Sequence, residues 1–247
     1  MNVQQAVEWK TKSKLFVSLA AKPGKTGENF YNTLFKHHNI DAEYIACECI
    51  DLKSDMQLVR EHCAGASITM PYKKQVEKYL DMSSTNFMPV NTIVNKDKFL
   101  TGYNCDYLGL QDLLKDSVKN KRVVILGDGA MADNVSLLCA DAKNVKIFSR
   151  RKDTWIYRHN ECDVLINATS IGMGTDETPV DKIKANLVVD CVIGNTKLTQ
   201  NARLAGISVI PGAEIYIAQF QHQFKLYTGQ APDQDVLKLI TKKVFDV

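Results

Sequence analysis

Residues 123–132, Val-Val-Ile-Leu-Gly-Asp-Gly-Ala-Met-Ala, decide the fold of the second half of the chain. The four apolar residues are typical of a buried strand, and a helix is expected after the glycines. Gly127 and Gly129 begin a G-x-G-x-x-A pattern, in which the first glycine allows a tight turn and the second lets the backbone approach a pyrophosphate. Backbone amides at the helix start, at Ala130 and Met131, are expected to face the phosphates. Glycines often only make turns, but the strand–turn–helix context favours dinucleotide binding.

The end of the next expected strand, 145–148, indicates which dinucleotide is bound. NAD-binding proteins usually carry an acid there, about 20 residues past the loop, to bind the ribose hydroxyls. This chain has Ser149, Arg150 and Arg151 instead. A guanidinium group pairs with a 2′-phosphate in two-point geometry, so the sequence predicts NADP as the cofactor. The alternative is a solvated pair of loop charges, and the negative charge of Asp128 opposes phosphate binding.

Outward from this loop, apolar runs alternate with helix-like stretches, which is typical of α/β sheets with helices on their faces. In the first half we expect strands at 15–20, 44–49 and 67–70, helices at 28–38 and 55–62, and a hairpin of 92–94 with 99–100. A helix at 106–117 follows, and further strands are expected at 163–166, 187–189 and 208–210, with helices at 215–227 and 233–243. Only 152–162 separate the second strand of this half from the third, so a full crossover helix barely fits. A reduced wall of the adenine pocket is expected there.

Composition excludes several classes of protein. The chain has 247 residues, 45% of them hydrophobic, and a net charge of +3 with scattered basic residues, so nucleic acid is not an expected partner. The start, Met1 to Lys12, is polar, and the apolar runs are too short to span a bilayer. The seven cysteines have no redox or zinc spacing and are interpreted as reduced core residues, so neither a metal site nor a membrane is expected. A cytoplasmic protein is predicted.

Three polar clusters at the ends of apolar runs hold residues that can do chemistry: Lys73, Asn91 and Asp106. Oxidising a secondary alcohol needs a hydride acceptor and a base for the hydroxyl proton, and a lysine beside a carboxylate can supply the base. The ordinary alternative is a lysine at a helix start and an aspartate that caps a helix. A lysine–aspartate pair ahead of a dinucleotide loop nevertheless suggests hydride transfer coupled to proton transfer.

At these residues the chain resembles the shikimate dehydrogenase family. The family's motifs NVTxPxK, VNT, GxNTD, NATSxGM and GxxMLxxQxxxxF are similar, in that order, to residues 67–73, 90–92, 102–106, 167–173 and 212–224. Each motif alone is weakly specific, but five in order indicate the family. The resemblance implies two α/β domains around a cleft. Residues 1–104, joined by the C-terminal helices 215–247, are expected to form the substrate-binding domain, and 105–214 the Rossmann-type NADP-binding domain.

The resemblance also implies a role for individual residues. Lys73 would donate and accept the proton. Asp106 would hold the Lys73 side chain and the substrate hydroxyl in place. The residues implied to contact the substrate are Lys25, Thr26, Thr69, Asn91 and Gln219. Those implied to contact NADP are Gly127, Gly129, Ala130, Met131, Ser149, Arg150, Arg151, Thr169, Cys191 and Gly212. Without the resemblance, turn capping, a buried strand hydroxyl and a solvated helix face are the ordinary interpretations of Asn91, Thr69 and Gln219.

The chain departs from the family pattern at two places. The family's SxSP serines, which hold the substrate carboxylate, align with 25–28, Lys-Thr-Gly-Glu, and Lys25 or Thr26 could still bind an anion. A tyrosine that contacts substrate aligns with Ile193. Losing such a buried hydrogen bond typically costs about 0.5–1.5 kcal/mol.

The expected function is reversible, NADP-dependent reduction of 3-dehydroshikimate to shikimate or a closely related cyclic hydroxy acid. The alternatives are a divergent paralogue that acts on quinate or another substrate, a non-catalytic NADP-binding sensor on the same fold, and a fold-related dehydrogenase of one-carbon carriers. The expected partner is a small anionic substrate, and the chain is expected to be a monomer or homodimer.

Overall fold

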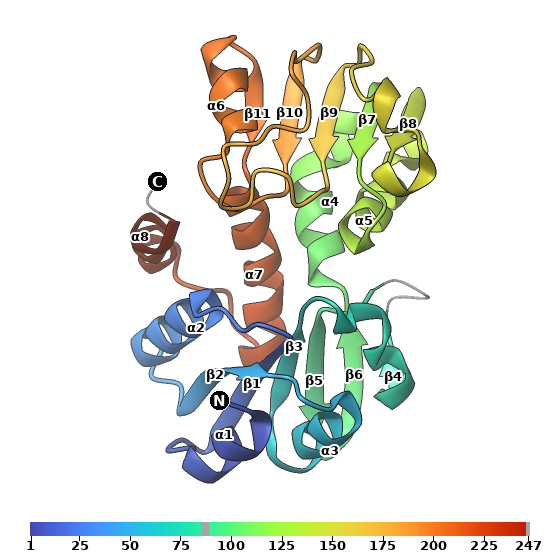
Figure 1. Cartoon of the computed structure of the whole chain (residues 1–247). Helices are drawn as coiled ribbons and strands as arrows, with labels where there is room; N and C mark the ends of the chain where they lie inside the picture. The colour runs from blue at the N-terminus through green and yellow to red at the C-terminus, as the bar shows by residue number, and fades with distance from the viewer. Residues whose placement is uncertain (85–88, 246–247) are drawn as a thin grey trace. The chain divides into compact units, whose positions relative to one another are not determined.

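The computed structural model describes residues 1–84 and 89–245 and divides the chain into two compact α/β units (Figure 1). The first unit contains Met1–Cys105 and Gln221–Val244, and the second contains Asp106–Phe220 and Phe245. The chain thus leaves the first unit once and returns to it within one helix. The expected α/β class is confirmed.

The first unit is built on a six-stranded mixed sheet of order β2-β1-β3-β5-β6-β4. Its strands are β1 (Lys14–Ala20), β2 (Ala42–Glu48), β3 (Gly65–Ile68), β4 (Met82–Ser83), β5 (Thr92–Lys96) and β6 (Phe99–Tyr103). Its helices are α1 (Val3–Trp9), α2 (Thr26–His37), α3 (Leu52–His62), the short 3-10 turns η1 (Tyr72–Lys74) and η2 (Val76–Tyr79), and α8 (Gln234–Phe245). β1, β2 and β3 are parallel, whereas β5 and β6 form the expected antiparallel hairpin.

Alternate residues of β1 pack on opposite faces of this sheet, as the period of a strand requires. Leu15, Val17 and Leu19 join a core formed with α1 and α3. Phe16 faces the other way, and its ring lies 5.6 Å from that of Phe35 in α2 and 4.6 Å from that of Tyr227 in α7 (Gly212–Thr228). Helices therefore cover both faces of the sheet, and α2 and the end of α7 share one of them.

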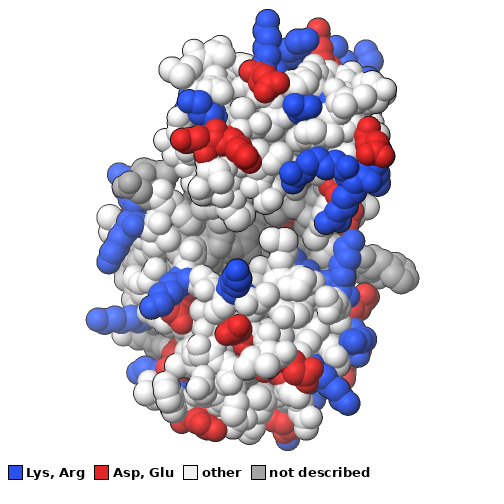
Figure 2. Space-filling view, viewed as in Figure 1, with Lys and Arg blue, Asp and Glu red and all other residues white. Residues whose placement is uncertain are grey.

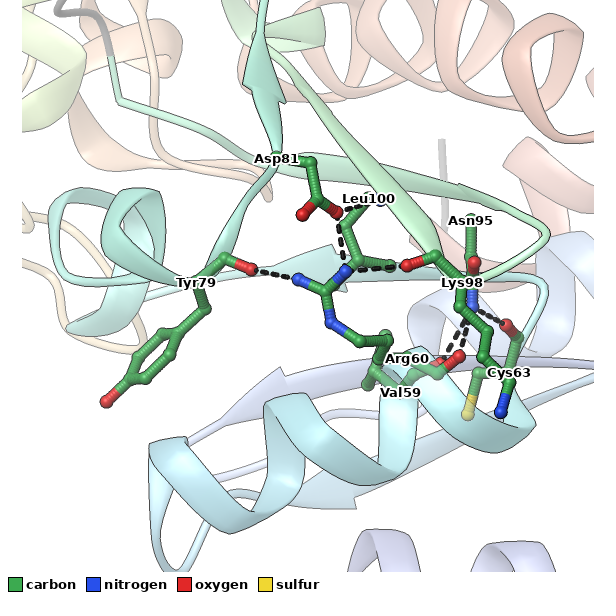
Figure 3. A network of polar contacts seen from close by, with 8 residues as sticks. All are labelled: Val59, Arg60, Cys63, Tyr79, Asp81, Asn95, Lys98 and Leu100. Carbon is green, nitrogen blue, oxygen red and sulfur yellow. Dashed lines mark hydrogen bonds and ion pairs between the residues drawn. The ribbon is translucent and has the colours of Figure 1, made fainter.

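Arg60 fastens α3 to the edge of the sheet that carries β4 (Figure 3). Its guanidinium donates to the carbonyls of Tyr79 and Lys98, at 2.8 and 2.6 Å, and pairs with Asp81 at 2.5 Å. This contact holds the pKa of Asp81 below its ordinary value. Asn95 of β5 donates from its amide nitrogen to the main-chain carbonyls of three residues at the end of α3, and so ties β5 to this helix. The hairpin and the segment before it are thus tied to a helix.

The second unit has a five-stranded, all-parallel sheet of order β11-β10-β9-β7-β8. Its strands are β7 (Arg122–Leu126), β8 (Asn144–Phe148), β9 (Val164–Asn167), β10 (Leu187–Asp190) and β11 (Ser208–Ile210). Its helices are α4 (Cys105–Val118, from its second residue), α5 (Ala130–Leu138), α6 (Lys197–Leu204), the start of α7, and the 3-10 turns η3 (Cys139–Asp141), η4 (Arg150–Lys152) and η5 (Trp155–Tyr157). The chain order reverses at β7, which has β8 on one side and β9 on the other. Ligands of such sheets bind at the carboxyl ends of the strands at this reversal.

The expected helices and strands all form, with ends shifted by a few residues. Two helices were missed, although each has a readable start. Asn2 and Gln5 form a reciprocal capping box ahead of α1, and the Thr196 side chain caps α6. Both helices are short, so their apolar spacing is weak. Between β8 and β9, where a full crossover helix was expected barely to fit, the chain forms the short 3-10 turns η4 and η5.

None of the helices within residues 1–84 and 89–245 is long and apolar enough to cross a membrane. Figure 2 shows Lys and Arg side chains mixed with Asp and Glu over the visible face, in agreement with the small net charge of +3.

Candidate functional site

The carboxyl end of β3 places Thr69 and Lys73. The Thr69 N–H donates to the Leu19 carbonyl at the end of β1, at 3.1 Å, and the Tyr72 N–H donates back to the Thr69 carbonyl at 2.9 Å. This turn leads into η1, where Lys73 is half-buried. The Lys73 carbonyl accepts from the Val90 N–H at 3.0 Å, which brings the lysine main chain next to the residue before Asn91. Two of the polar clusters of the sequence therefore meet where β3 ends and β5 begins, in the middle of the first sheet.

Asn91 is 4% exposed and its side chain is held in one orientation. Its Oδ1 accepts from the Thr92 hydroxyl at 2.7 Å and from the Cys105 N–H at 2.8 Å. Within the described residues its Nδ2 has no acceptor, and this nitrogen is not fully buried. The amide thus keeps two N–H groups available for a ligand, and Asn91 is bonded to the start of α4.

Asp106 and Gln219 are buried polar residues of the second unit. Asp106 lies in the first turn of α4 and is 8% exposed; the positive end of the helix dipole favours a carboxylate there. Gln219 of α7 is also 8% exposed, and its side-chain amide has no hydrogen-bond partner among the described residues. Neither amide atom of Gln219 is a fully buried unpaired atom, so the amide keeps some exposure through which a ligand can reach it. Gly109 lets α4 approach α7 closely, because a Cβ there would lie 2.4 Å from the Gln219 nitrogen.

The start of α2 carries the residues that align with the family's serine pair. Lys25 is exposed at the N-cap position, forms no side-chain cap, and makes no ion pair in the described part of the chain, while Thr26 is half-buried. A Cβ at Gly27 would lie 2.9 Å from Cε1 of the Tyr44 ring, which is itself buried. A serine at position 27 would therefore collide with the Tyr44 ring. The exposed cationic group at the start of α2 is Lys25. Burial raises the pKa of the Tyr44 hydroxyl, so this hydroxyl stays protonated.

The glycine loop of the second unit has the geometry of a phosphate-binding turn. Gly127 has φ of +115°, and a Cβ there would lie 2.8 Å from the Ala168 carbonyl oxygen, so only glycine fits without strain. Gly129 is the N-cap of α5, and a Cβ there would meet nothing within 4 Å. No side chain caps α5, so the amides of Ala130 and its neighbour Met131, which lack partners inside the helix, remain available to an anion.

The arginines stand at the carboxyl end of β8. Ser149 is 2% exposed, and its hydroxyl oxygen accepts from the Arg151 N–H at 3.1 Å, so its side chain organises the turn. Arg150 lies over the Trp155 ring at 6.0 Å. Arg151 is 82% exposed and pairs loosely with Asp128 of the glycine loop at 3.9 Å. The Arg151 guanidinium thus lies beside the glycine loop, but Asp128 already contacts it.

Thr169, Cys191 and Gly212 come together around the ends of β9 and β10. The Thr169 hydroxyl donates to Asn167 at 2.6 Å, and the Cys191 N–H donates to the Asn167 carbonyl at 3.0 Å. A Cβ at Gly212 would lie 2.3 Å from the Val192 carbonyl oxygen, so the chain entering α7 touches the residue after Cys191. Burial raises the pKa of the Cys191 thiol, which is therefore neutral.

Beside these strand ends a cavity of ≈ 440 Å³ opens, lined by Gly172, Gly174, Thr175, Asp176, Ile193, Gly194, Asn195 and Thr196. Ile193 is 43% exposed there. Where the family pattern has a tyrosine hydroxyl, this chain therefore presents an apolar side chain next to open space.

Sequence reasoning missed Gly109, Tyr44 and a second buried glutamine on α7, Gln223. Gln223 is 4% exposed, and its amide bonds Tyr31, Thr92 and the Asn91 carbonyl. The available clue was that Gln223 lies four residues after Gln219, which puts both on one face of the helix.

Comparisons with known proteins identify the family of the chain. The family model described as the shikimate dehydrogenase substrate binding domain matches residues 27–93. A relative from Pyrococcus abyssi, shikimate dehydrogenase (NADP(+)), is 31% identical over 238 residues, which cover 85% of this chain and 90% of the relative. The solved structure of a shikimate 5-dehydrogenase-like protein matches 94% of this chain and 97% of its own, with a TM-score of 0.84 and 27% identity. That of a shikimate dehydrogenase in complex with NADP+ matches 93% and 95%, with a TM-score of 0.83 and 25% identity. The chain therefore belongs to the shikimate dehydrogenase family.

Proposed function

We propose that this protein catalyses the reversible, NADP-dependent reduction of 3-dehydroshikimate to shikimate, or of a closely related cyclic hydroxy acid. As a member of its family it is an oxidoreductase of the shikimate dehydrogenase type, acting on CH–OH groups. The observation that carries the substrate proposal is the cluster at the end of β3. There Lys73 is bonded through its main chain to Val90, and the amide of Asn91 is held with two donors available. A hydroxylated ring needs such donors at fixed positions.

The residues of the second unit fit NADP. The glycine loop offers main-chain amides without a side chain in the way, and Arg150 and Arg151 follow the neighbouring strand. The name of the Pyrococcus relative includes NADP(+), and one similar solved structure holds NADP+. Arg151 would hold the 2′-phosphate, and the α5 amides the pyrophosphate. Thr169, Cys191 and Gly212 would lie beside the nicotinamide. When bound, the nicotinamide supplies or accepts the hydride.

Lys73 and Asp106 would handle the proton. In the reduction, the Lys73 ammonium donates a proton to the carbonyl oxygen as the carbon receives the hydride. In the oxidation, the neutral amine accepts the hydroxyl proton. Asp106 would keep the lysine and the substrate hydroxyl in place, since a carboxylate accepts hydrogen bonds from both. Gln219, Thr69 and Asn91 would bind ring hydroxyls.

Recognition of the substrate carboxylate would differ from the family pattern. With no serine at position 25 or 27, the exposed ammonium of Lys25 and the Thr26 hydroxyl are the groups at the start of α2 that can bind an anion. The point charge of a lysine is less directional than a pair of hydroxyls. We therefore expect weaker discrimination between shikimate and other ring carboxylates such as quinate.

Turnover with defined substrates tests this proposal. Purified protein is given shikimate or quinate with NADP+ or NAD+, and NADPH or NADH formation is followed by absorbance. We expect the highest kcat/KM with shikimate and NADP+. Tight NADP(H) binding without turnover of either acid would support the non-catalytic sensor instead, and turnover confined to quinate would support the paralogue.

The charge of Asp128 should limit the affinity for NADP. Replacing Asp128 by Asn removes a carboxylate next to the phosphates and releases Arg151, so the Kd for NADP+ should fall by about threefold to tenfold, with a smaller change for NAD+. Arg151→Ala should raise the Kd for NADP+ selectively. Asp141→Asn, which removes an exposed carboxylate beyond the end of α5, is the control. An equal change for both dinucleotides in Asp128→Asn would show that the 2′-phosphate does not lie near this pair.

A further inference from the structure

A relay of buried side chains connects α2 and α7 to the amide of Asn91. The Tyr31 hydroxyl donates to Gln223 Oε1 at 2.5 Å. Gln223 Nε2 donates to the Thr92 hydroxyl at 2.7 Å and to the Asn91 carbonyl at 3.3 Å. The Thr92 hydroxyl in turn donates to Asn91 Oδ1 at 2.7 Å. Tyr31, Thr92 and Gln223 are 1%, 0% and 4% exposed, so water does not compete for these bonds.

Two main-chain groups fix the direction of the bonds in this relay, the Asn91 carbonyl at Gln223 and the Cys105 N–H at the Asn91 side chain. A backbone carbonyl can only accept, so the contact with the Asn91 carbonyl requires the NH₂ side of Gln223 to point toward Asn91. Gln223 therefore donates to Thr92, and the hydrogen of the Thr92 hydroxyl is left to point at Asn91. A backbone N–H can only donate, so the Cys105 N–H requires Oδ1 of Asn91 on its side.

The consequence is that Asn91 has one allowed amide orientation. Its Oδ1 is occupied by two donors, and its Nδ2, which has no acceptor within the described residues, is the atom left to a ligand. A flipped amide would set NH₂ against the Cys105 N–H and the Thr92 hydroxyl hydrogen. Asn91 can then recognise only a group that accepts hydrogen bonds, such as the oxygen of a hydroxyl or ketone.

We propose that Gln223 is a positioning residue for the substrate, acting through Thr92 to lock Asn91 as a hydrogen-bond donor. Gln223 uses Oε1 and Nε2 within the protein, so it does not need to touch the substrate. The inference rests on the proposed function, because it takes Asn91 to contact the substrate.

The relay is tested by steady-state kinetics with shikimate and NADP+ on Thr92→Val, Thr92→Ser, Gln223→Leu and the double variant Thr92→Val/Gln223→Leu. Valine keeps the shape of threonine but removes the hydroxyl, whereas serine keeps the hydroxyl. We expect Thr92→Val and Gln223→Leu each to raise KM for shikimate by about threefold to tenfold, with KM for NADP+ unchanged. Thr92→Ser should keep KM for shikimate near the wild-type value. The double variant should be no worse than the worse single variant, since both break one chain.

The matched control is Gln221→Leu, which replaces a glutamine on the same helix whose side chain bonds Gln234 instead. An unchanged KM for shikimate in Thr92→Val and Gln223→Leu, with only a lower Tm, would overturn the inference, as would multiplicative effects in the double variant. If Gln223→Leu does not fold, the Thr92→Val and Thr92→Ser pair carries the test.

A second measurement separates this inference from the proposed function. The side-chain ¹³Cγ and ¹⁵Nδ2 signals of Asn91, assigned through Asn91→Asp, report the bonds to Oδ1 without turnover. They should shift in Thr92→Val and Gln223→Leu but not in Gln221→Leu. If wild-type protein does not oxidise shikimate while these signals shift, the proposed function fails and the locked amide stands. If the signals do not move, the relay is wrong whatever the activity.

Discussion

Replacing Lys73 by Ala should lower kcat for shikimate oxidation by about 10²–10⁴-fold, because proton transfer by a positioned side chain contributes that much to the rate. KM for NADP+ should not change, since Lys73 is not among the residues proposed to hold NADP+. The measurement is NADPH formation at saturating shikimate and NADP+, beside a Tm measurement that verifies folding.

Lys74→Ala is the matched control, because Lys74 is the next residue in η1 and is exposed. It should keep kcat near the wild-type value. A Lys73→Ala protein that still turns over within about tenfold of wild type would remove the lysine from the proton transfer.

Gly109→Ala should destabilise the protein and impair substrate turnover. In an ordinary helix interior this substitution stabilises by about 0.5–1 kcal/mol. Here the added Cβ would lie 2.4 Å from the Gln219 nitrogen and 2.8 Å from its Cα, both backbone atoms, so α7 has to move. We expect the free energy of unfolding to fall by about 1–3 kcal/mol. A shift of about 1 Å in the position of Gln219 can lower kcat/KM for shikimate by about 10²-fold.

Denaturant unfolding and steady-state kinetics measure the two effects of Gly109→Ala. Lys115→Ala, an exposed change on the same helix, is the control and should leave kcat/KM unchanged. A gain in stability for Gly109→Ala would mean that helix propensity outweighs the contact and that α4 and α7 are not tightly packed. Unchanged kcat/KM in a destabilised variant would remove Gln219 from the substrate site.

Local patterns were sufficient to predict the framework of the fold. Runs such as 123–126 are apolar on both sides and lie before glycines, so a buried strand and a turn follow from them alone. The order of the motifs indicated the family, and the structure places Thr69, Lys73 and Asn91 where β3 ends and β5 begins. Their roles in catalysis stay predictions.

The residues that escaped prediction act through long-range contacts. Tyr31 and Gln223 are 192 positions apart in the chain, and no local periodicity connects them. Gly109 has a low helix propensity, and the structural reason for it is the backbone of another helix. Tyr44 was visible only as a strand residue, although its ring reaches the start of α2. Such contacts depend on the sheet order and the helix faces, which the sequence leaves open until the fold is known.

The close packing of Gly27 against Tyr44 constrains how this protein can change in evolution. Serine at position 27 would restore one hydroxyl of the family pattern, but its Cβ would lie 2.9 Å from a ring that is only 3% exposed and has little room to turn. A single Gly27→Ser substitution is therefore unfavourable while the Tyr44 ring keeps its place. A smaller side chain at position 44 would remove this contact. Mutant libraries that aim to place a hydroxyl at position 27 should therefore vary positions 27 and 44 together.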